Sequence, residues 1–186
     1  MPIHIVATAL ALAITVPAMA QTTGPFTLSS KEVAEGRTIP LAQAFGGMGC
    51  TGKNISPSLA WRGAPADARS FAVTMYDPDA PTGSGWWHWV VYNIPGNVSA
   101  LAVGAGDPAK KLLAPGTLQG NTDFGAPGYG GPCPPAGDKP HHYVFTVYAL
   151  KVDKLDVPAG ATAAYVGFNI HANMIAKATF TALYGR

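Results

Sequence analysis

The stretch from residue 70 to residue 95, SFAVTMYDPDAPTGSGWWHWVVYNIP, constrains the fold of this chain more than any other part of the sequence. Residues 71–76 and 86–93 are rich in β-branched and aromatic side chains, so each predicts a β-strand. The connection between them is polar and rich in Gly, Pro and Asp. The pattern therefore predicts a hairpin-like pair of strands joined by a long loop.

Polar side chains are expected at the loop ends of both strands, because successive side chains of a strand point to opposite faces. On the first strand, the carboxylate of Asp77 shares a face with three apolar residues, Phe71, Val73 and Met75. On the returning strand, His88 is in phase with Trp86, Val90 and Tyr92. A carboxylate and an imidazole are therefore expected where two buried strands meet their connecting loop.

Glycine and proline divide the chain into short segments. Of 186 residues, 22 are Gly and 17 are Pro, while 48% are hydrophobic and 12% are charged. A chain of this length can bury one real core, and frequent turn residues favour many short strands. Twelve Lys and Arg against ten Asp and Glu give a net charge of +2, with no basic run longer than Lys110-Lys111. We therefore predict one mostly β domain and no nucleic-acid or anionic-membrane surface.

Three further segments carry regular patterns. Residues 141–150 predict a strong strand, and residues 152–157 and 180–184 predict short ones. Apolar side chains at helical spacing predict one amphipathic helix over residues 163–178. The residues of that stripe are Tyr165, Phe168, Ala172, Ile175 and Thr179. His171 in this helix is expected to pack or cap rather than to bind a ligand.

The first 20 residues have the pattern of a signal peptide. An apolar run over residues 5–17 precedes Ala18-Met19-Ala20, a small-x-small site at which signal peptidase cleaves. The run is shorter than the roughly 20 apolar residues that span a bilayer. We expect residues 1–20 to be removed, which leaves residues 21–186 as a periplasmic or secreted protein without a transmembrane segment. A buried N-terminal helix is the alternative.

Cys50 and Cys133 are the two cysteines of the chain. Disulfides persist in the oxidising compartments that exported proteins reach, so a bridge between the two and a pair of free thiols both stay open. A zinc site is not expected, because neither a CxxC motif nor a neighbouring histidine at ligand spacing is present.

Three Gly-rich segments invite functional interpretations. GMGCTGKN at residues 47–54 imitates a phosphate-binding loop, but Asn54 replaces the required hydroxyl and no apolar strand precedes it. DFG at residues 123–125 lacks the other kinase motifs. Residues 116–140 form a long loop of the kind that is usually functional or disordered. Its glycines allow backbone N–H groups to turn towards an anion, but composition alone does not predict that they do so.

Several motifs in order resemble the phosphatidylethanolamine-binding protein family, also called Raf kinase inhibitor proteins. They are DPDAP at residues 77–81, WWH at 86–88, GP at 131–132 and HHY at 141–143. The similarity runs from about residue 26 to the C-terminus and is greatest to the bacterial branch, which shares NISP at residues 54–57.

The resemblance implies a single antiparallel β-sandwich domain with a Greek-key-like central sheet, a few peripheral helices and a small anion pocket at one end. It implies that the pocket is lined by Asp77, His88, His141 and Tyr143, with Trp86 and Pro132 as walls. It also makes the Ala80–Pro81 bond a candidate cis peptide. No cofactor, metal or catalytic residue is implied.

The expected ligand is phosphate or a phosphorylated headgroup of the phospholipid kind. Imidazole and phenol groups donate hydrogen bonds to phosphate oxygens, and Asp77 holds one histidine tautomer or meets an ammonium group. Because the motifs contain no Arg or Lys, we expect modest binding that is tighter at pH 6 than at pH 8.

Two rival functions stay open on the sequence. Asp77, His88 and His141 have the residue types of a two-histidine, one-carboxylate metal site or of an acid–base pair for hydrolysis. No serine or cysteine nucleophile accompanies them in a motif, so we predict a binding protein rather than an enzyme. The family also implies a role in modulating a protein partner, which the sequence does not identify. The inhibitor label itself does not travel with the fold, because function belongs to the site and its partners.

Overall fold

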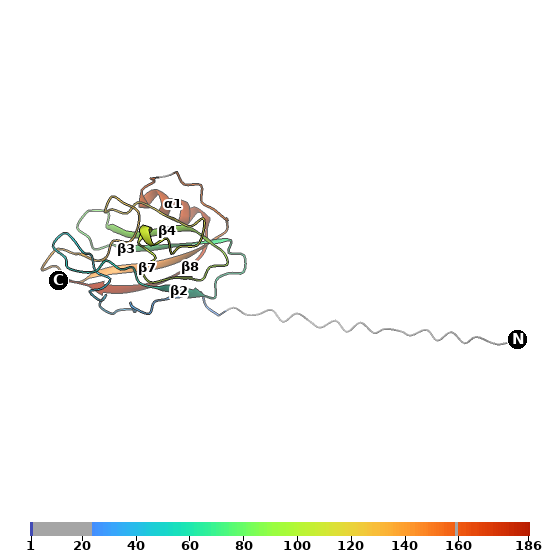
Figure 1. The fold of residues 1–186 in the computed structure, drawn as a ribbon, viewed down its shortest axis with the longest axis horizontal. Coiled ribbons are helices and arrows are strands. Elements are labelled where there is room, and N and C mark those ends of the chain that lie inside the picture. The colour runs from blue at the N-terminus through green and yellow to red at the C-terminus, as the bar shows by residue number, and fades with distance from the viewer. Residues whose placement is uncertain (2–23, 159) are drawn as a thin grey trace.

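The computed structural model describes Met1, residues 24–158 and residues 160–186, so the predicted signal peptide lies outside the described residues. Two antiparallel sheets and one helix form three layers (Figure 1). The small sheet has the order β1 (Thr27–Ser29), β2 (Leu59–Arg62), β5 (Ala100–Leu101). The large sheet has the order β6 (Leu118–Gln119), β4 (Trp86–Pro95), β3 (Ser70–Asp77), β7 (His141–Leu150), β8 (Met174–Tyr184). The mostly β, antiparallel sandwich expected from the sequence is confirmed.

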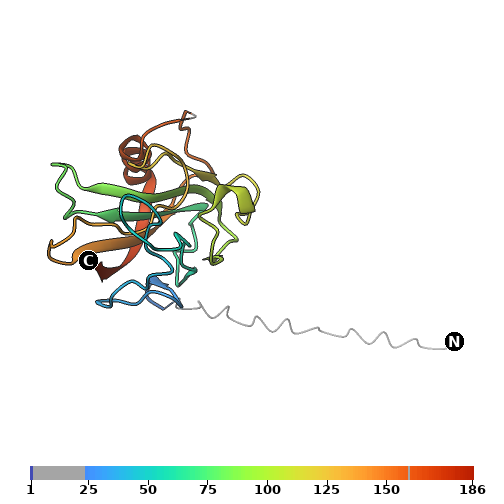
Figure 2. The same cartoon turned by 60° about the vertical axis from the view of Figure 1, so that its left-hand side comes forward.

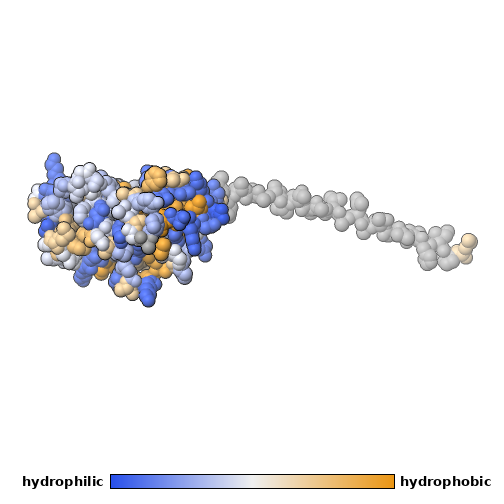
Figure 3. All heavy atoms as spheres, turned by 90° about the horizontal axis from the view of Figure 1, so that it is seen from above, coloured by the Kyte–Doolittle hydropathy of each residue, from blue (hydrophilic) through white to orange (hydrophobic). Residues whose placement is uncertain are grey.

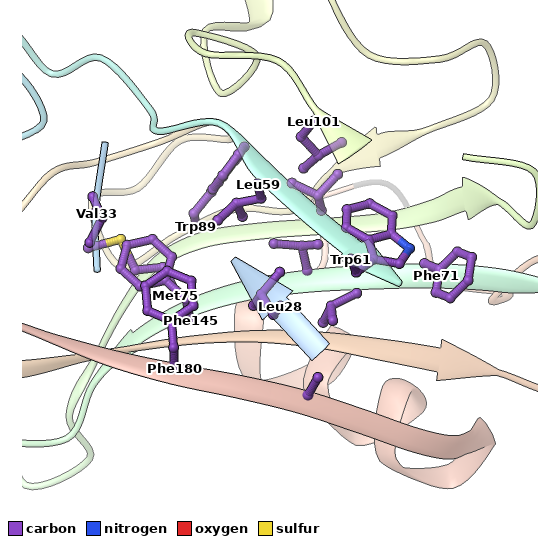
Figure 4. Close-up of a cluster of buried hydrophobic side chains, with 14 of the residues drawn as sticks. Leu28, Val33, Leu59, Trp61, Phe71, Met75, Trp89, Leu101, Phe145 and Phe180 are labelled. Atoms are coloured by element: carbon purple, nitrogen blue, oxygen red, sulfur yellow. The ribbon is translucent and has the colours of Figure 1, made fainter. Parts of the chain in front are cut away.

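The main hydrophobic core lies between the two sheets. In Figure 4, Leu59 and Trp61 of β2 lie over the large sheet, and Trp61 packs beside Phe71 of β3. The residues of β3 that were expected to share a face, Phe71, Val73 and Met75, all belong to this core. Burial of such side chains contributes about 1.5–3 kcal/mol each, which fixes the position of β3 between β4 and β7.

A second apolar cluster lies on the other face of the large sheet, under α1 (Ala163–Asn173). The helix and the N-terminal strand lie on opposite sides of this sheet (Figures 1 and 2). Seen from the helix side, the surface mixes hydrophilic and hydrophobic residues (Figure 3). A short 3-10 helix, η1 (Pro108–Lys110), interrupts the loop between β5 and β6. Among the described residues, no helix has the length and apolar character needed to cross a membrane.

Two sequence predictions are wrong in the C-terminal third. The helix begins as expected, with Thr162 Oγ1 accepting from the Tyr165 amide, but it ends at Asn173, five residues early. Residues 174–184 instead pair with β7 along its length, because the ladder satisfies their backbone groups. The predicted apolar stripe is also misplaced, since Phe168 is 72% exposed whereas Val166 and Ile170 are buried.

The strand expected over residues 152–157 is absent from the described structure. This segment instead forms an irregular connection beneath α1. The side-chain amide of Asn93 bonds it to the sheet: the Leu155 amide donates to Asn93 Oδ1 at 2.8 Å. A side chain therefore takes the place of the strand ladder here.

Strand β4 contains two β-bulges, which change the phase of its side chains. Met75 pairs with Trp89 but Tyr76 pairs with Trp87, so His88 is an extra residue. A bulge places two neighbouring residues opposite one residue of the partner strand. The predicted in-phase row is therefore wrong beyond His88: Val90 and Tyr92 belong to the cluster under the helix, while His88 faces the inner side. A second irregularity lies at Asn93, whose φ is +58°.

Cys50 and Cys133 form a disulfide that closes a separation of 83 residues. It joins the loop around residues 47–50 to the loop around residues 133–135. The Arg186 side chain joins the same two loops, because Nε donates to the Pro134 carbonyl at 2.6 Å and Nη1 donates to the Gly49 carbonyl at 3.0 Å. The loops are therefore tied by one covalent and two polar connections.

Candidate functional site

A pocket of about 180 Å³ lies at one end of the large sheet, where β3 ends and where β4 and β7 begin. Asp77, His88, His141 and Tyr143 all line it, together with Trp86. These side chains come from distant parts of the sequence and meet because β3 is antiparallel to both neighbouring strands. The other lining residues are Met48, Ala80, Pro81, Thr82, Phe124, Cys133, Pro134 and Pro135.

Asp77 is the buried acceptor at the base of the pocket, with a side chain only 3% exposed. Its Oδ1 accepts from the amides of Asp79 at 2.8 Å and Ala80 at 3.2 Å. His141 Nδ1 lies 2.8 Å from Oδ2 and donates to it. A buried carboxylate persists when hydrogen bonds replace its water. Asp77 therefore fixes both the start of the loop and the orientation of the His141 ring.

His88 presents a different arrangement, because its partner is a backbone carbonyl. Its Nδ1 lies 2.7 Å from the Gly130 oxygen. A carbonyl only accepts, so the Nδ1 atom carries the hydrogen and Nε2 holds a lone pair. Burial lowers the pKa of His88 to about 4, so the ring is neutral near pH 7. His88 therefore offers an acceptor and not a donor.

The loop over residues 129–131 holds the Gly130 carbonyl in place. The Gly130 amide donates to the His88 carbonyl at 2.9 Å, and the Gly131 amide donates to Asn54 Oδ1 at 2.7 Å. Asn54 Nδ2 donates in turn to the Tyr129 carbonyl at 3.0 Å. These backbone N–H groups are already bonded, so this part of the loop does not form the anion nest that its glycines would allow. Gly131 is required because a Cβ there would collide with the Gln43 carbonyl.

The Tyr143 hydroxyl is buried at the pocket and has no hydrogen-bond partner among the described residues. Burial raises the pKa of this phenol, and the nearby charge of Asp77 raises it further. The Tyr143 ring packs edge-on against His88, with centroids 5.1 Å apart. Because a buried donor without a partner costs about 1–3 kcal/mol, this hydroxyl marks a place where a ligand atom would be stabilising.

A second aspartate–histidine pair lies at the rim. Asp79 Oδ2 accepts from both the His142 amide and His142 Nδ1, each at 2.7 Å. The bond from the His142 amide is the main reason that the pKa of Asp79 is lowered. The two aspartates of DPDAP therefore pair with the two histidines of HHY in order, which joins the β3 loop to β7.

Phe124 is the pocket residue that sequence reasoning missed. It packs edge-on against both His88 and Trp86, with ring centroids 5.4 Å apart in each case. The sequence signal for Phe124 was the DFG tripeptide at residues 123–125, which here has no relation to kinases. Asp123 Oδ2 accepts from the Trp87 amide at 2.7 Å, and this bond fixes Phe124 beside β4. Met48, Pro134 and Pro135 of the pocket wall had no sequence signal.

Two expectations from the family resemblance are not met. Pro132 is buried behind the wall, where its carbonyl accepts from the Phe45 amide at 3.0 Å, and the neighbouring residues Cys133 to Pro135 line the pocket instead. The Ala80–Pro81 bond is trans, like every other peptide bond in the described part of the chain.

The geometry also bears on the metal alternative. Within the described residues, no group of three or more His, Cys, Asp or Glu side chains is arranged to hold a metal ion. The Nδ1 atoms of His88 and His141 are committed to Gly130 and Asp77, and both oxygens of Asp77 are already bonded. The three residues are thus held by hydrogen bonds to one another and to the backbone.

Known proteins match the chain over most of its length. The family model described as phosphatidylethanolamine-binding protein matches residues 29–185. The UPF0098 protein YbcL of Escherichia coli K12 is 52% identical over 86% of this chain and 87% of its own length, and YbhB of the same organism is 49% identical over 84% and 98%. The crystal structure of E. coli YbcL, described as a new member of the mammalian PEBP family, superposes with a TM-score of 0.85 at 51% identity, covering 87% of this chain and 98% of that one.

Proposed function

The chain belongs to the phosphatidylethanolamine-binding protein family, and from that premise we propose that it is a binding protein whose pocket holds phosphate or a phosphorylated headgroup. The family binds phosphate-containing ligands. The proposal is one of binding without catalysis, since the residues that line the pocket include neither a serine nor a free cysteine.

The observation that carries the proposal is the buried Tyr143 hydroxyl without a partner. It is an uncharged donor beside His141 and His88, in a pocket large enough for a group of a few non-hydrogen atoms. An anionic oxygen that accepts from Tyr143 would remove the cost of leaving this donor unbonded. Because no Lys or Arg is among the described lining residues, we expect modest affinity.

We further propose that the protein acts outside the cytoplasm. The support is the signal-peptide pattern of residues 1–20. A Mycobacterium tuberculosis relative that is 38% identical over 74% of this chain is named as a proposed lipoprotein, LppC, and lipoproteins are exported. Sequencing the N-terminus of the protein recovered from its own cells tests this proposal: Gln21 as the first residue supports it, and an intact Met1 in the cytoplasm contradicts it.

The binding proposal is tested by isothermal titration with inorganic phosphate and with phosphorylethanolamine. We expect saturable 1:1 binding that is tighter at pH 6, where phosphate keeps a proton that it can donate to His88 Nε2, than at pH 8, and that is lost in His88→Ala. The matched control is His171→Ala, which removes a histidine whose Nδ1 also donates to a carbonyl, that of Gly167 at 2.8 Å, on the far side of the sheet. Equal affinity in His88→Ala and wild type, or no binding by the wild type, would contradict the proposal.

A further inference from the structure

We infer that the chain carries a second binding site, which takes a small carboxylate with a compact hydrocarbon body. The site is a cavity lined by Trp61, and we call it the Trp61 cavity. It lies at the opposite end of the sandwich from the pocket that Asp77 lines, and the two share no lining residue. The inference goes beyond the proposed function and does not depend on it.

The Trp61 cavity has a volume of about 280 Å³ and lies where β2 ends, where β3 begins and where β4 leads into the loop before β5. Its apolar lining consists of Trp61, Phe71, Ala64 and Val98. Phe71 and Asp77 are six residues apart in β3, so at about 3.3 Å per residue the two sites are roughly 20 Å apart. A cavity near the lower limit of ordinary ligand sites, roughly 300–1,000 Å³, suits a small molecule.

The Trp61 indole is a donor that the chain leaves unbonded. Trp61 is 4% exposed, and its Nε1 atom has no hydrogen-bond partner among the described residues. Figure 4 shows the indole nitrogen on the side of the ring that faces Phe71, which also lines the cavity. An indole N–H group only donates, and a buried donor without an acceptor costs free energy. An acceptor atom in the cavity would therefore be stabilising.

A second buried tryptophan of the same core shows the usual arrangement. Trp89 Nε1 donates to Gln119 Oε1 at 2.7 Å, so this indole is satisfied within the protein. Trp61 has beside it the ring of Phe71, with centroids 5.4 Å apart. The face of an aromatic ring is a weak acceptor compared with an oxygen atom. The donor of Trp61 is therefore the one for which a ligand oxygen would be a gain.

The walls of the Trp61 cavity are fixed before a ligand arrives. In the loop after β4, the Val98 amide donates to the Pro95 carbonyl at 2.9 Å. The Trp61 amide donates to the Ser99 carbonyl, also at 2.9 Å, which ties this loop to β2. After β2, Gly63 has a φ of +70°, and its surroundings leave no room for a Cβ. A ligand would not have to order these segments, which lowers the cost of binding.

Arg62 determines the charge of the cavity. It is the one ionisable side chain among the lining residues of the described chain, and it is exposed. None of the ion pairs within the described residues includes it. The other polar lining side chains, Asn97 and Ser99, are uncharged. Because a guanidinium pairs favourably with a carboxylate, the cavity favours an anion over a cation.

A carboxylate on a hydrocarbon body meets each of these requirements. With a pKa of about 4 it is ionised near pH 7, so its oxygens accept from Trp61 Nε1 and its charge is attracted by Arg62. The hydrocarbon body lies against Phe71 and Val98, where its burial is favourable. An ammonium ligand has no acceptor for the indole. A fully polar anion such as phosphate would be desolvated against an apolar wall, which is costly.

The experiment is ¹H–¹⁵N NMR of the intact protein, in which the indole N–H groups of its four tryptophans give separate signals. Single Trp→Phe variants assign them. The probes are benzoate, benzamide and benzylamine, which share a ring and differ in charge. At pH 7 we expect benzoate to shift the Trp61 signal downfield in a saturable way and to bind about two- to fivefold more tightly than benzamide. Benzylamine should leave this signal unmoved.

Trp61→Phe removes the donor and keeps an aromatic ring in the core. We expect it to bind benzoate at least about tenfold more weakly than wild type, with unchanged phosphate affinity at the pocket that Asp77 lines. Trp89→Phe is the matched control, because it removes an indole donor that is already bonded. It should keep the wild-type affinity for benzoate. Thermal melts verify that both variants are folded.

Arg62→Glu tests the site without altering the core, since Arg62 is exposed. Reversal of this charge should weaken benzoate binding at least about fivefold. Arg37→Glu is its control, because Arg37 is also exposed and does not line the cavity. Unchanged benzoate affinity in Arg62→Glu and Trp61→Phe would overturn the inference.

Two outcomes with the wild-type protein would also overturn it. Benzoate might leave the Trp61 signal unmoved while it shifts that of Trp86, which would place the carboxylate in the pocket that Asp77 lines. Benzylamine or benzamide might bind the Trp61 cavity as tightly as benzoate, which would remove the role of charge. Neither outcome alters the phosphate titrations, so the proposed function is judged separately.

Discussion

The two bulges of β4 use the same backbone device for opposite purposes. At the pocket end, His88 is the extra residue, and Nδ1 is the ring nitrogen that bonds to the chain, through the Gly130 carbonyl. At the far end, the Asn93 side chain makes its hydrogen bonds within the protein. Its Oδ1 accepts from the Leu155 amide and its Nδ2 donates to the Leu155 carbonyl. Both side chains are buried and polar. What separates a binding residue from a structural one here is whether its hydrogen-bonding capacity is already satisfied.

The same contrast holds along β3. At the far end, Ser70 Oγ donates to the Val152 carbonyl at 2.6 Å, and the exposed pair Arg69–Asp153 lies beside it. At the pocket end, Asp77 is satisfied but its neighbour Tyr143 is not. The polar side chain at the far end of β3 is therefore satisfied by the chain, whereas the Tyr143 hydroxyl at the pocket end is not. Four experiments break or sharpen this comparison.

The largest expected effect is that of Asp77→Ala. The change leaves two amides and His141 without their acceptor, and loss of one partner of a buried pair costs about 3–5 kcal/mol of unfolding free energy. Ser70→Ala at the other end of β3 should cost only about 1 kcal/mol. Urea unfolding measures both. If the two substitutions cost the same, Asp77 is not the anchor of the loop.

The second effect is a pH dependence that only the pocket bulge carries. Burial lowers the pKa of His88 from 6.5 to about 4, so between these values the unfolded chain binds a proton that the folded chain does not. Stability is therefore complete above pH 6.5 and decreases as the pH falls, by about 3 kcal/mol in total. Unfolding free energies measured from pH 7 to pH 4 in wild type and His88→Gln isolate this contribution. Parallel curves for the two proteins would show that His88 titrates normally.

The third effect tests the far bulge. Asn93→Ala removes both bonds to Leu155 and places a β-carbon residue without a local hydrogen bond at positive φ, so we expect a loss of about 1–3 kcal/mol. Asn93→Gly, which tolerates this φ, separates the backbone cost from that of the hydrogen bonds. Phosphate affinity should be unchanged in both variants. A change in affinity would mean that the two ends of β4 are coupled.

The smallest expected effect on stability is that of Tyr143→Phe. The hydroxyl has no partner within the described chain, so its removal should change the unfolding free energy by less than about 1 kcal/mol in either direction. Phosphate binding, in contrast, should weaken by at least about tenfold, because the ligand loses its buried donor. A destabilised Tyr143→Phe protein with normal binding would reverse the assignment of this group.

Local sequence patterns predicted much of this architecture. The alternation in residues 71–76 and the β-rich composition of residues 86–93 and 141–150 indicated β3, β4 and β7, and DPDAP and HHY directed attention to the residues that meet at the pocket. The predictions were wrong for segments whose conformation depends on pairing with a distant strand. Residues 174–178 fit a helix by spacing, but their pairing with β7 makes them a strand. The prediction of which side chains share a face was wrong beyond His88, because a bulge depends on how the strand pairs with its partner.

The sequence predicted which residues line the pocket better than it predicted their hydrogen-bonding roles. Nothing in WWH shows that the imidazole faces a carbonyl, because Gly130 reaches His88 only through the folded loop that Asn54 holds. The donor expected of His88 is therefore an acceptor. The prediction of Pro132 as a pocket wall failed for a related reason. A shift of one residue along the loop decides which side chain forms the wall.

The extra residue in β4 also matters for protein design. A regular hairpin grafted with the residues of this site would carry the imidazole on the wrong side of the sheet, since without the bulge strict alternation cannot bring His88 and Trp89 to the same surface. Transplanting the pocket thus requires transplanting an irregularity. In this scaffold a single extra residue places an imidazole in the wall of the pocket.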